Sequence, residues 1–164
     1  MSDATEASNI EVGKKAPAFT LEDAEGEKVK LTDQAGKWVV IYFYPKDDTP
    51  GCTTEALEFT DLANDFETAN TVVFGVSPDS CEKHAKFIEK HGLGVRLLAD
   101  PKKTVLTKYD AFGIKKMYGK EVEGVKRSTV IVDPKGKVAH HWKSVRAKGH
   151  AAKVLETVQK LQAG

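Results

Sequence analysis

The chain has 164 residues, of which 25 are basic and 24 acidic, and its formal net charge is +1. This length fits one domain with a single core, and the balanced charge gives no electrostatic reason to expect nucleic acid or an anionic membrane as a partner. No apolar run is long enough for a transmembrane helix, and residues 1–9 lack the basic start and apolar stretch of a secretory signal. We therefore expect a flexible tail over residues 1–9, one domain over residues 10–164, and a cytoplasmic location.

The first predicted elements are a hairpin and a buried strand. Residues 18–21 and 28–31 flank Glu25–Gly26–Glu27, which indicates a small hairpin at the edge of the domain. Residues 38–44 form an unbroken run of β-branched and aromatic side chains, and this run predicts a central strand that is covered on both faces. Pro45 ends the strand.

Helices and strands alternate along the next part of the chain. After Gly51, apolar residues recur at helical spacing as far as Phe66. A strand is predicted over residues 71–76, a second helix runs to about His91, and a short strand follows over residues 96–99.

The last third of the chain completes the predicted fold. A short helix is expected over residues 104–112 and, because residues 114–124 are rich in glycine and lysine, an exposed loop after it. Residues 128–132 and 138–142 form a hairpin with an Asp-Pro-Lys-Gly turn, and an amphipathic helix runs over about 149–161. This order predicts an α/β protein of thioredoxin-like fold, with a central mixed sheet flanked by helices and an N-terminal β-hairpin.

Cys52 is the strongest candidate for chemistry. It follows a strand, a turn and Gly51, so it lies in the first turn of the predicted helix. A cysteine reacts as its thiolate, and an ordinary thiol with a pKa of about 8.5 is mostly protonated at neutral pH. The unpaired N–H groups and the dipole at the start of a helix favour the anion. We therefore predict that Cys52 is a nucleophile.

The residues around Cys52 fit a reaction with peroxide. When a thiolate attacks a peroxide the O–O bond breaks, and donors are needed as charge moves to the leaving oxygen. Thr49 can offer its hydroxyl, Pro45 stiffens the turn and presents an apolar surface to the site, and Arg127 can supply a cation in a fixed fork. Glu55 fits two interpretations, a plain helix-surface residue or a residue that orients Arg127.

Together these residues resemble a known family. The segments Tyr42–Phe43–Tyr44–Pro45 and Cys52–Thr53–Thr54–Glu55 are similar to the active-site signature of the peroxiredoxins, and more narrowly of the bacterioferritin comigratory protein, or peroxiredoxin Q, subgroup. The similarity extends from about Val12 to Leu161. It includes Gly75–Val76–Ser77–Pro78–Asp79–Ser80, Met117–Tyr118–Gly119–Lys120 and Arg127–Ser128–Thr129.

The resemblance implies a thioredoxin fold and an antioxidant thiol peroxidase without metal or organic cofactor. By position it implies that Cys52 is the peroxidatic cysteine, that Thr49 and Arg127 activate it, that Pro45 shields the pocket, and that Glu55 is the acidic residue common in the subgroup. The implied substrates are hydrogen peroxide and organic hydroperoxides. The implied reductant is thioredoxin or another thiol, and the implied state is a monomer.

The chain departs from the subgroup in its second cysteine. Many members carry a resolving cysteine five residues after the first, where this chain has Leu57, and others carry it at the position of Ile88. The remaining thiol is Cys81. Either Cys81 captures the Cys52 sulfenic acid as a disulfide, after local unwinding that brings the Cα atoms within about 7 Å, or an external thiol closes a one-cysteine cycle. We predict that peroxide produces the Cys52–Cys81 disulfide.

Other patterns give weaker hypotheses. Cys81, His84 and His91 could share one face of a helix, but without a fourth ligand we do not expect a metal site. A disulfide oxidoreductase would need Cys-x-x-Cys, and Thr49 occupies the first of those positions. A non-enzymatic binding domain on the same scaffold would leave Cys52 dispensable.

Overall fold

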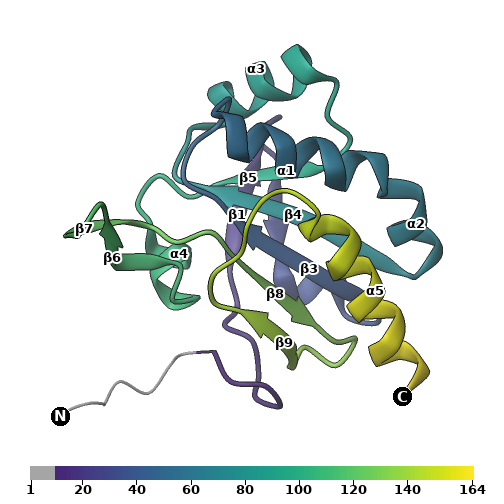
Figure 1. The fold of residues 1–164 in the computed structure, drawn as a ribbon. Coiled ribbons are helices and arrows are strands. Elements are labelled where there is room, and N and C mark those ends of the chain that lie inside the picture. The colour runs from purple at the N-terminus through teal and green to yellow at the C-terminus, as the bar shows by residue number, and fades with distance from the viewer. Residues whose placement is uncertain (1–9) are drawn as a thin grey trace, which may run out of the picture.

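A mixed sheet organises the part of the chain that the computed structural model describes, which is residues 10–164 apart from the side chains of Lys116 and Met117; the predicted tail over residues 1–9 lies outside it. Within residues 10–164 this sheet has seven strands (Figure 1). In spatial order they are β2 (Lys28–Lys30), β1 (Thr20–Asp23), β5 (Arg96–Ala99), β4 (Thr71–Ser77), β3 (Trp38–Phe43), β8 (Ser128–Val132) and β9 (Val138–Trp142). Strands β3, β4 and β5 run parallel, whereas β8 is antiparallel to β3 and β1 is antiparallel to β5. The predicted mixed sheet, central strand and N-terminal edge hairpin are confirmed.

Helices cover both faces of this sheet (Figure 1). They are α1 (Pro50–Asp61), α2 (Ala63–Thr68), α3 (Cys81–His91), α4 (Thr104–Lys108) and α5 (His150–Ala163), with a 3₁₀ turn η1 (Leu31–Gln34). Because successive strand side chains point to opposite faces, Val39, Ile41 and Phe43 pack with α4, while Val40 and Tyr42 pack with α1, α3 and α5. Burial on both faces explains the unbroken apolar run of β3.

Two predicted helices have different bounds in the structure. The helix predicted to reach Phe66 is divided at Leu62, whose φ of −99° and ψ of 8° interrupt the helical path between α1 and α2. The helix predicted over residues 104–112 ends at Lys108, because Asp110 adopts a left-handed φ of 58° and turns the chain into the next strand.

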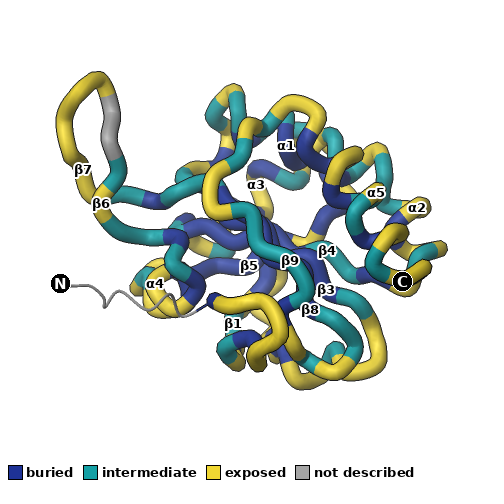
Figure 2. Tube along the Cα trace, turned by 60° about the horizontal axis from the view of Figure 1, so that its bottom comes forward, coloured by how far each residue is buried: buried dark blue, intermediate teal, exposed yellow. Residues whose placement is uncertain are grey.

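The prediction of an exposed loop over residues 114–124 was wrong. Residues 112–125 form an antiparallel hairpin of β6 (Phe112–Met117) and β7 (Lys120–Val125), which projects from the body of the molecule (Figure 2). Its two turn residues, Tyr118 and Gly119, have φ values of 54° and 78°, as a tight hairpin turn requires. Glycine and lysine enrichment therefore reflected an exposed hairpin.

The parallel strands determine where the two cysteines lie. Helix α1 follows β3 and helix α3 follows β4, and these neighbouring strands run in the same direction. The loops that lead into the two helices therefore lie at the same edge of the sheet. Cys52 lies in the first turn of α1 and Cys81 is the first residue of α3.

Candidate active site around Cys52

Cys52 is held at the start of α1 and is almost completely covered. Thr49 is the N-cap of the helix, and Pro50 occupies its first position, where the missing N–H of proline has no cost. The first N–H groups of a helix have no intrahelical partner. Cys52 lies among them with only 1% of its surface exposed.

Arg127 meets Cys52 from a distant part of the chain. It directly precedes β8, whose Ser128 pairs with Phe43 at the end of β3, and this pairing places the guanidinium over the start of α1. Arg127 Nη2 donates to Cys52 Sγ at 3.3 Å, and Nη1 donates to Glu55 Oε1 at 2.6 Å. The two nitrogens of one planar group therefore hold the sulfur and the carboxylate side by side.

Glu55 is a buried partner of Arg127. Its side chain is fully buried, and its second oxygen, Oε2, has no hydrogen-bond partner among the described residues. Burial raises the pKa of Glu55 from 4.5 to about 7, although the charge of Arg127 opposes the shift. Burial also disfavours the Arg127 charge, but the charges of Glu55 and Cys52 outweigh this and raise the pKa of Arg127. Of the two interpretations left open for Glu55, the geometry excludes an exposed surface position.

Gly51 allows the guanidinium to approach the helix. A Cβ atom at Gly51 would lie 3.0 Å from Arg127 Nη2, closer than carbon and nitrogen normally approach. The glycine before Cys52 therefore leaves the space that Arg127 occupies. This reason for glycine was not visible in the sequence, because it depends on a side chain 76 positions further along the chain.

The structure places Thr49 and Pro45 on the loop before α1. The Thr49 hydroxyl donates to the carbonyl oxygen of Lys46 at 2.8 Å, so its proton is engaged within the loop. Pro45 directly follows Tyr44 beyond the end of β3 and is partly exposed. Both residues lie on the loop that leads to Cys52, as the sequence indicated.

Cys81 lies in different surroundings from Cys52, and both cysteines are free thiols. Cys81 Sγ contacts Glu22 Oε1 of β1 at 3.7 Å, and partial burial together with the Glu22 charge raises the pKa of this thiol. Strand β1 is separated from β3 by β5 and β4, so three strand spacings place β1 roughly 14 Å from β3. A disulfide between the two cysteines therefore requires a local change of structure.

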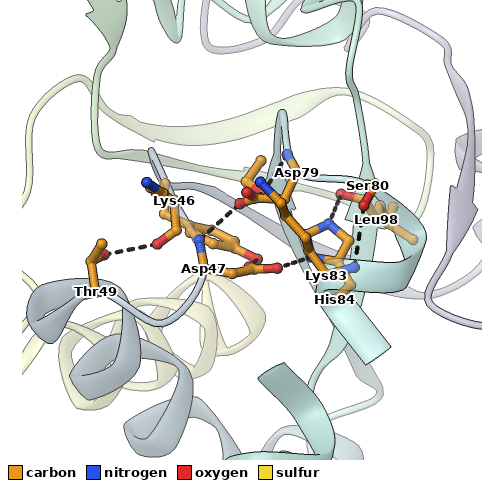
Figure 3. A network of polar contacts seen from close by, with 10 residues as sticks. Lys46, Asp47, Thr49, Asp79, Ser80, Lys83, His84 and Leu98 are labelled. Carbon is orange, nitrogen blue, oxygen red and sulfur yellow. Dashed lines mark hydrogen bonds and ion pairs between the residues drawn. The ribbon is translucent and has the colours of Figure 1, made fainter. Parts of the chain in front are cut away.

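Sequence reasoning missed a buried polar network beside the Cys52 loop (Figure 3). Asp47 accepts a hydrogen bond from the Tyr44 hydroxyl at 2.6 Å and lies 2.7 Å from Nδ1 of His84. The backbone N–H of Asp47 donates to Asp79 at 2.8 Å. The signal in the sequence is the i, i+7 spacing of His84 and His91 on one predicted helix face, which fits carboxylate partners on the loop as well as a metal site.

These histidines have carboxylate partners on the loop. His84 lies against Asp47 and His91 against Asp48, whereas Cys81 lies against Glu22. Among the described residues, no group of three His, Cys, Asp or Glu side chains has the arrangement of a metal site. Nor does any helix of residues 10–164 combine the length and apolar character needed to cross a membrane.

Comparisons with known proteins agree in pointing to one family. The AhpC/TSA family model matches residues 12–141. The chain is 47% identical over 150 residues to peroxiredoxin Bcp of Bacillus subtilis, an alignment that spans 92% of this chain and 96% of the relative. A putative peroxiredoxin of Mycobacterium tuberculosis is 49% identical over 150 residues, again spanning 92% and 96%. The solved structure of the bacterioferritin comigratory protein of Xanthomonas campestris, studied for alkyl peroxide reduction, matches with a TM-score of 0.85 and 38% identity over 92% of this chain and 98% of that chain.

Proposed function

The chain belongs to the AhpC/TSA family and is a peroxiredoxin, an antioxidant thiol peroxidase with a thioredoxin-like fold, and from that premise we propose that Cys52 is its peroxidatic cysteine. The observation that carries the proposal is the fork of Arg127, whose two terminal nitrogens contact Cys52 Sγ and Glu55 Oε1. A thiol, a cation and the start of a helix in one buried place are what the attack of a thiolate on peroxide requires.

The reaction transfers one oxygen atom to Cys52. The thiolate attacks one oxygen of the hydroperoxide, an S–O bond forms and the O–O bond breaks. The leaving alkoxide or hydroxide takes up a proton and departs as alcohol or water. Sulfur is oxidised by two electrons to a sulfenic acid, and the peroxide is reduced by the same two. Arg127 stabilises the thiolate before the attack and the negative charge that develops on oxygen during it.

Three further residues have supporting roles in this proposal. The hydroxyl of Thr49 turns from the Lys46 carbonyl, which it contacts at 2.8 Å, to donate to the peroxide. Pro45 restricts access of water to the sulfur. Glu55 holds the guanidinium in position through its 2.6 Å contact. Glu55 is thus a positioning residue that acts through Arg127.

We propose that Cys81 resolves the sulfenic acid. The Cys81 thiolate attacks the Cys52 sulfur, an S–S bond forms, and hydroxide leaves and is protonated to water. Two observations support this assignment: the cysteines begin helices at the same edge of the sheet, and Cys81 is the other thiol of the chain. Thioredoxin then reduces the disulfide with its own dithiol. We further propose a monomeric, cytoplasmic enzyme without nucleic-acid or membrane partners, which sedimentation and cell fractionation would test.

A coupled assay tests the whole cycle. Peroxide turnover with thioredoxin, thioredoxin reductase and NADPH is measured for wild type, Cys52→Ser, Cys81→Ser and the matched control Thr53→Ser. We expect no turnover in Cys52→Ser and normal turnover in Thr53→Ser, since Thr53 is the neighbouring residue and keeps its hydroxyl. Turnover that persists without Cys52 would overturn the proposal.

The same variants separate the two fates of the sulfenic acid. After one equivalent of peroxide, non-reducing mass spectrometry of the wild type should show a Cys52–Cys81 disulfide. Cys81→Ser should lose turnover with thioredoxin. If peroxide instead leaves Cys81 as a free thiol while Cys52 carries only oxyacids, the one-cysteine cycle is correct.

A further inference from the structure

The loop between β3 and α1 is fastened to helix α3 by buried polar contacts. Asp47 is the centre of this contact, because three separate groups reach it. Its Oδ1 accepts from the Tyr44 hydroxyl at 2.6 Å, its Oδ2 lies 2.7 Å from His84 Nδ1, and its backbone N–H donates to Asp79 Oδ2 at 2.8 Å (Figure 3). None of these groups is used in the oxygen transfer to Cys52.

His84 binds two acceptors at once. Its side chain is fully buried, with Nδ1 facing the Asp47 carboxyl group and Nε2 lying 2.9 Å from the carbonyl oxygen of Leu98. A backbone carbonyl only accepts hydrogen bonds, so Nε2 of His84 donates to Leu98, and Nδ1 shares a proton with the Asp47 carboxyl group in a buried contact. Loss of either partner leaves a buried polar group without a hydrogen bond, which is costly.

The next residue of the loop makes a second contact with the same helix. Asp48 receives a hydrogen bond from Lys90 at 2.7 Å and lies 2.8 Å from Nε2 of His91, both in the last turn of α3. Asp47 therefore contacts the first half of α3 and Asp48 contacts its last turn. The buried contact carries most of the strength, since exposed ion pairs contribute little.

Opening of this loop is a requirement of the resolving step. Cys52 has 1% of its surface exposed, and the Cys81 thiol contacts Glu22 of β1. No thiol, internal or external, reaches the Cys52 sulfur until the loop and the first turn of α1 move. Movement of the loop that carries Asp47 separates Asp47 from His84, because His84 stays within α3.

We propose that Asp47 and His84 form a clamp that holds the Cys52 loop closed, and that the strength of this clamp sets how the Cys52 sulfenic acid divides between capture by a thiol and further oxidation. The closed loop keeps Cys52 beside Arg127, where a second peroxide can react with it. The open loop exposes the sulfur to Cys81 or to an external thiol. The inference rests on the proposed peroxidase function, and Asp47 and His84 are positioning residues in it.

The chain offers a matched pair of substitutions at Asp47. In Asp47→Asn the amide oxygen still accepts from Tyr44, and the amide nitrogen donates to Nδ1 of a neutral His84, which keeps its bond to Leu98. Every hydrogen bond of the clamp is thus retained by a side chain that does not ionise. Asp47→Ala removes the hydrogen bonds that the Asp47 side chain makes with Tyr44 and His84. Asp61→Ala, an exposed aspartate at the other end of α1, is the control for loss of a carboxylate.

The first measurement needs no peroxide and is therefore independent of the proposed function. In a Cys81→Ser background, iodoacetamide labels Cys52 only when the loop opens. We expect Asp47→Ala to speed labelling by about tenfold to a hundredfold, the factor that corresponds to leaving a buried polar group without its hydrogen-bond partner. Asp47→Asn and Asp61→Ala should resemble the background protein. Equal labelling rates in all four proteins would overturn the clamp.

The second measurement follows the sulfenic acid in proteins that retain Cys81. The proteins are turned over with thioredoxin at increasing peroxide concentrations. Compared with wild type, Asp47→Ala should accumulate less Cys52 sulfinic acid per cycle and should react more slowly with peroxide in the first step. Asp47→Asn should have the wild-type value for both quantities. A purely structural role would lower activity without changing the share of sulfinic acid, and that result would overturn the inference. If Asp47→Ala does not fold, Tyr44→Phe removes one clamp hydroxyl and should shift both measurements in the same direction. Failure of Cys52→Ser to abolish turnover would instead count against the peroxidase assignment.

Discussion

Replacement of Glu55 by glutamine should change how stability depends on pH. Glu55 is fully buried, and burial raises its pKa from 4.5 to about 7 in the folded chain. A carboxyl group whose pKa is higher in the folded than in the unfolded state takes up a proton on folding. Its stabilising contribution is therefore complete below pH 4.5 and is lost as the pH rises through 7. Glutamine keeps the size of the side chain and an oxygen for Arg127, but it does not titrate.

The size of the effect follows from the shift. At 1.36 kcal/mol per pH unit the full shift corresponds to about 3.4 kcal/mol, of which about 2.5 kcal/mol develops between pH 5 and pH 8. The unfolding free energy of Glu55→Gln, measured relative to wild type, should therefore rise by about 2.5 kcal/mol across this interval. Other titrating groups are present in both proteins and cancel in the difference.

Urea unfolding at pH 5, 6, 7 and 8 measures this difference directly. Glu89→Gln is the control, because Glu89 is exposed on α3 and the same chemical change there should give a difference that does not vary with pH. If the Glu55→Gln difference is also constant from pH 5 to pH 8, the buried carboxyl is ionised throughout. The cost of its burial would then be fully offset by Arg127.

Three further substitutions test the packing around the site. Arg127→Lys replaces a fork by a point charge, and we expect stopped-flow fluorescence to show Cys52 oxidation slowed about 100-fold; an unchanged rate would remove Arg127 from the mechanism. Gly51→Ala adds a Cβ atom 3.0 Å from Arg127 Nη2, so peroxide reactivity should fall while stability in urea hardly changes, because alanine suits a helix; a stability loss with normal reactivity would contradict this. Gly75→Ala adds a Cβ atom 2.6 Å from Tyr42 Cζ and should destabilise the fold by about 1–3 kcal/mol in urea, whereas wild-type stability would mean that the ring moves aside freely.

The central part of the fold was predictable because its signals are local. The unbroken apolar run of β3 results from burial on both faces, and Pro45 and Gly51 mark the turn and the start of α1 within a few residues of Cys52. The hairpin of β6 and β7 was missed for an equally local reason. Its turn uses Tyr118–Gly119 in place of the usual Asn-Gly, and its strands are too exposed to show an apolar pattern.

The contacts of Asp47 were not predictable, because the sequence around it reads as an ordinary polar turn. Its partner His84 is 37 residues away, and the contact forms only because β3 and β4 are parallel neighbours that place the first loop beside α3. Arg127 was found in advance only because the chemistry of Cys52 required a cation. No comparable chemical requirement pointed from Asp47 to a histidine.

Two pairs of side chains from distant elements therefore position Cys52 and its loop. Arg127, held by Glu55 from 72 positions away in the sequence, contacts the sulfur in front of β8, and Asp47 and His84 fasten the loop to α3. The nucleophile itself depends on only a few neighbouring residues, but its geometry depends on both pairs. Transfer of residues 45–52 to another strand–helix junction would carry the thiol, the helix start and the glycine, yet neither Arg127 nor His84. Such a graft should give an alkylatable cysteine that reacts with peroxide no faster than a free thiol.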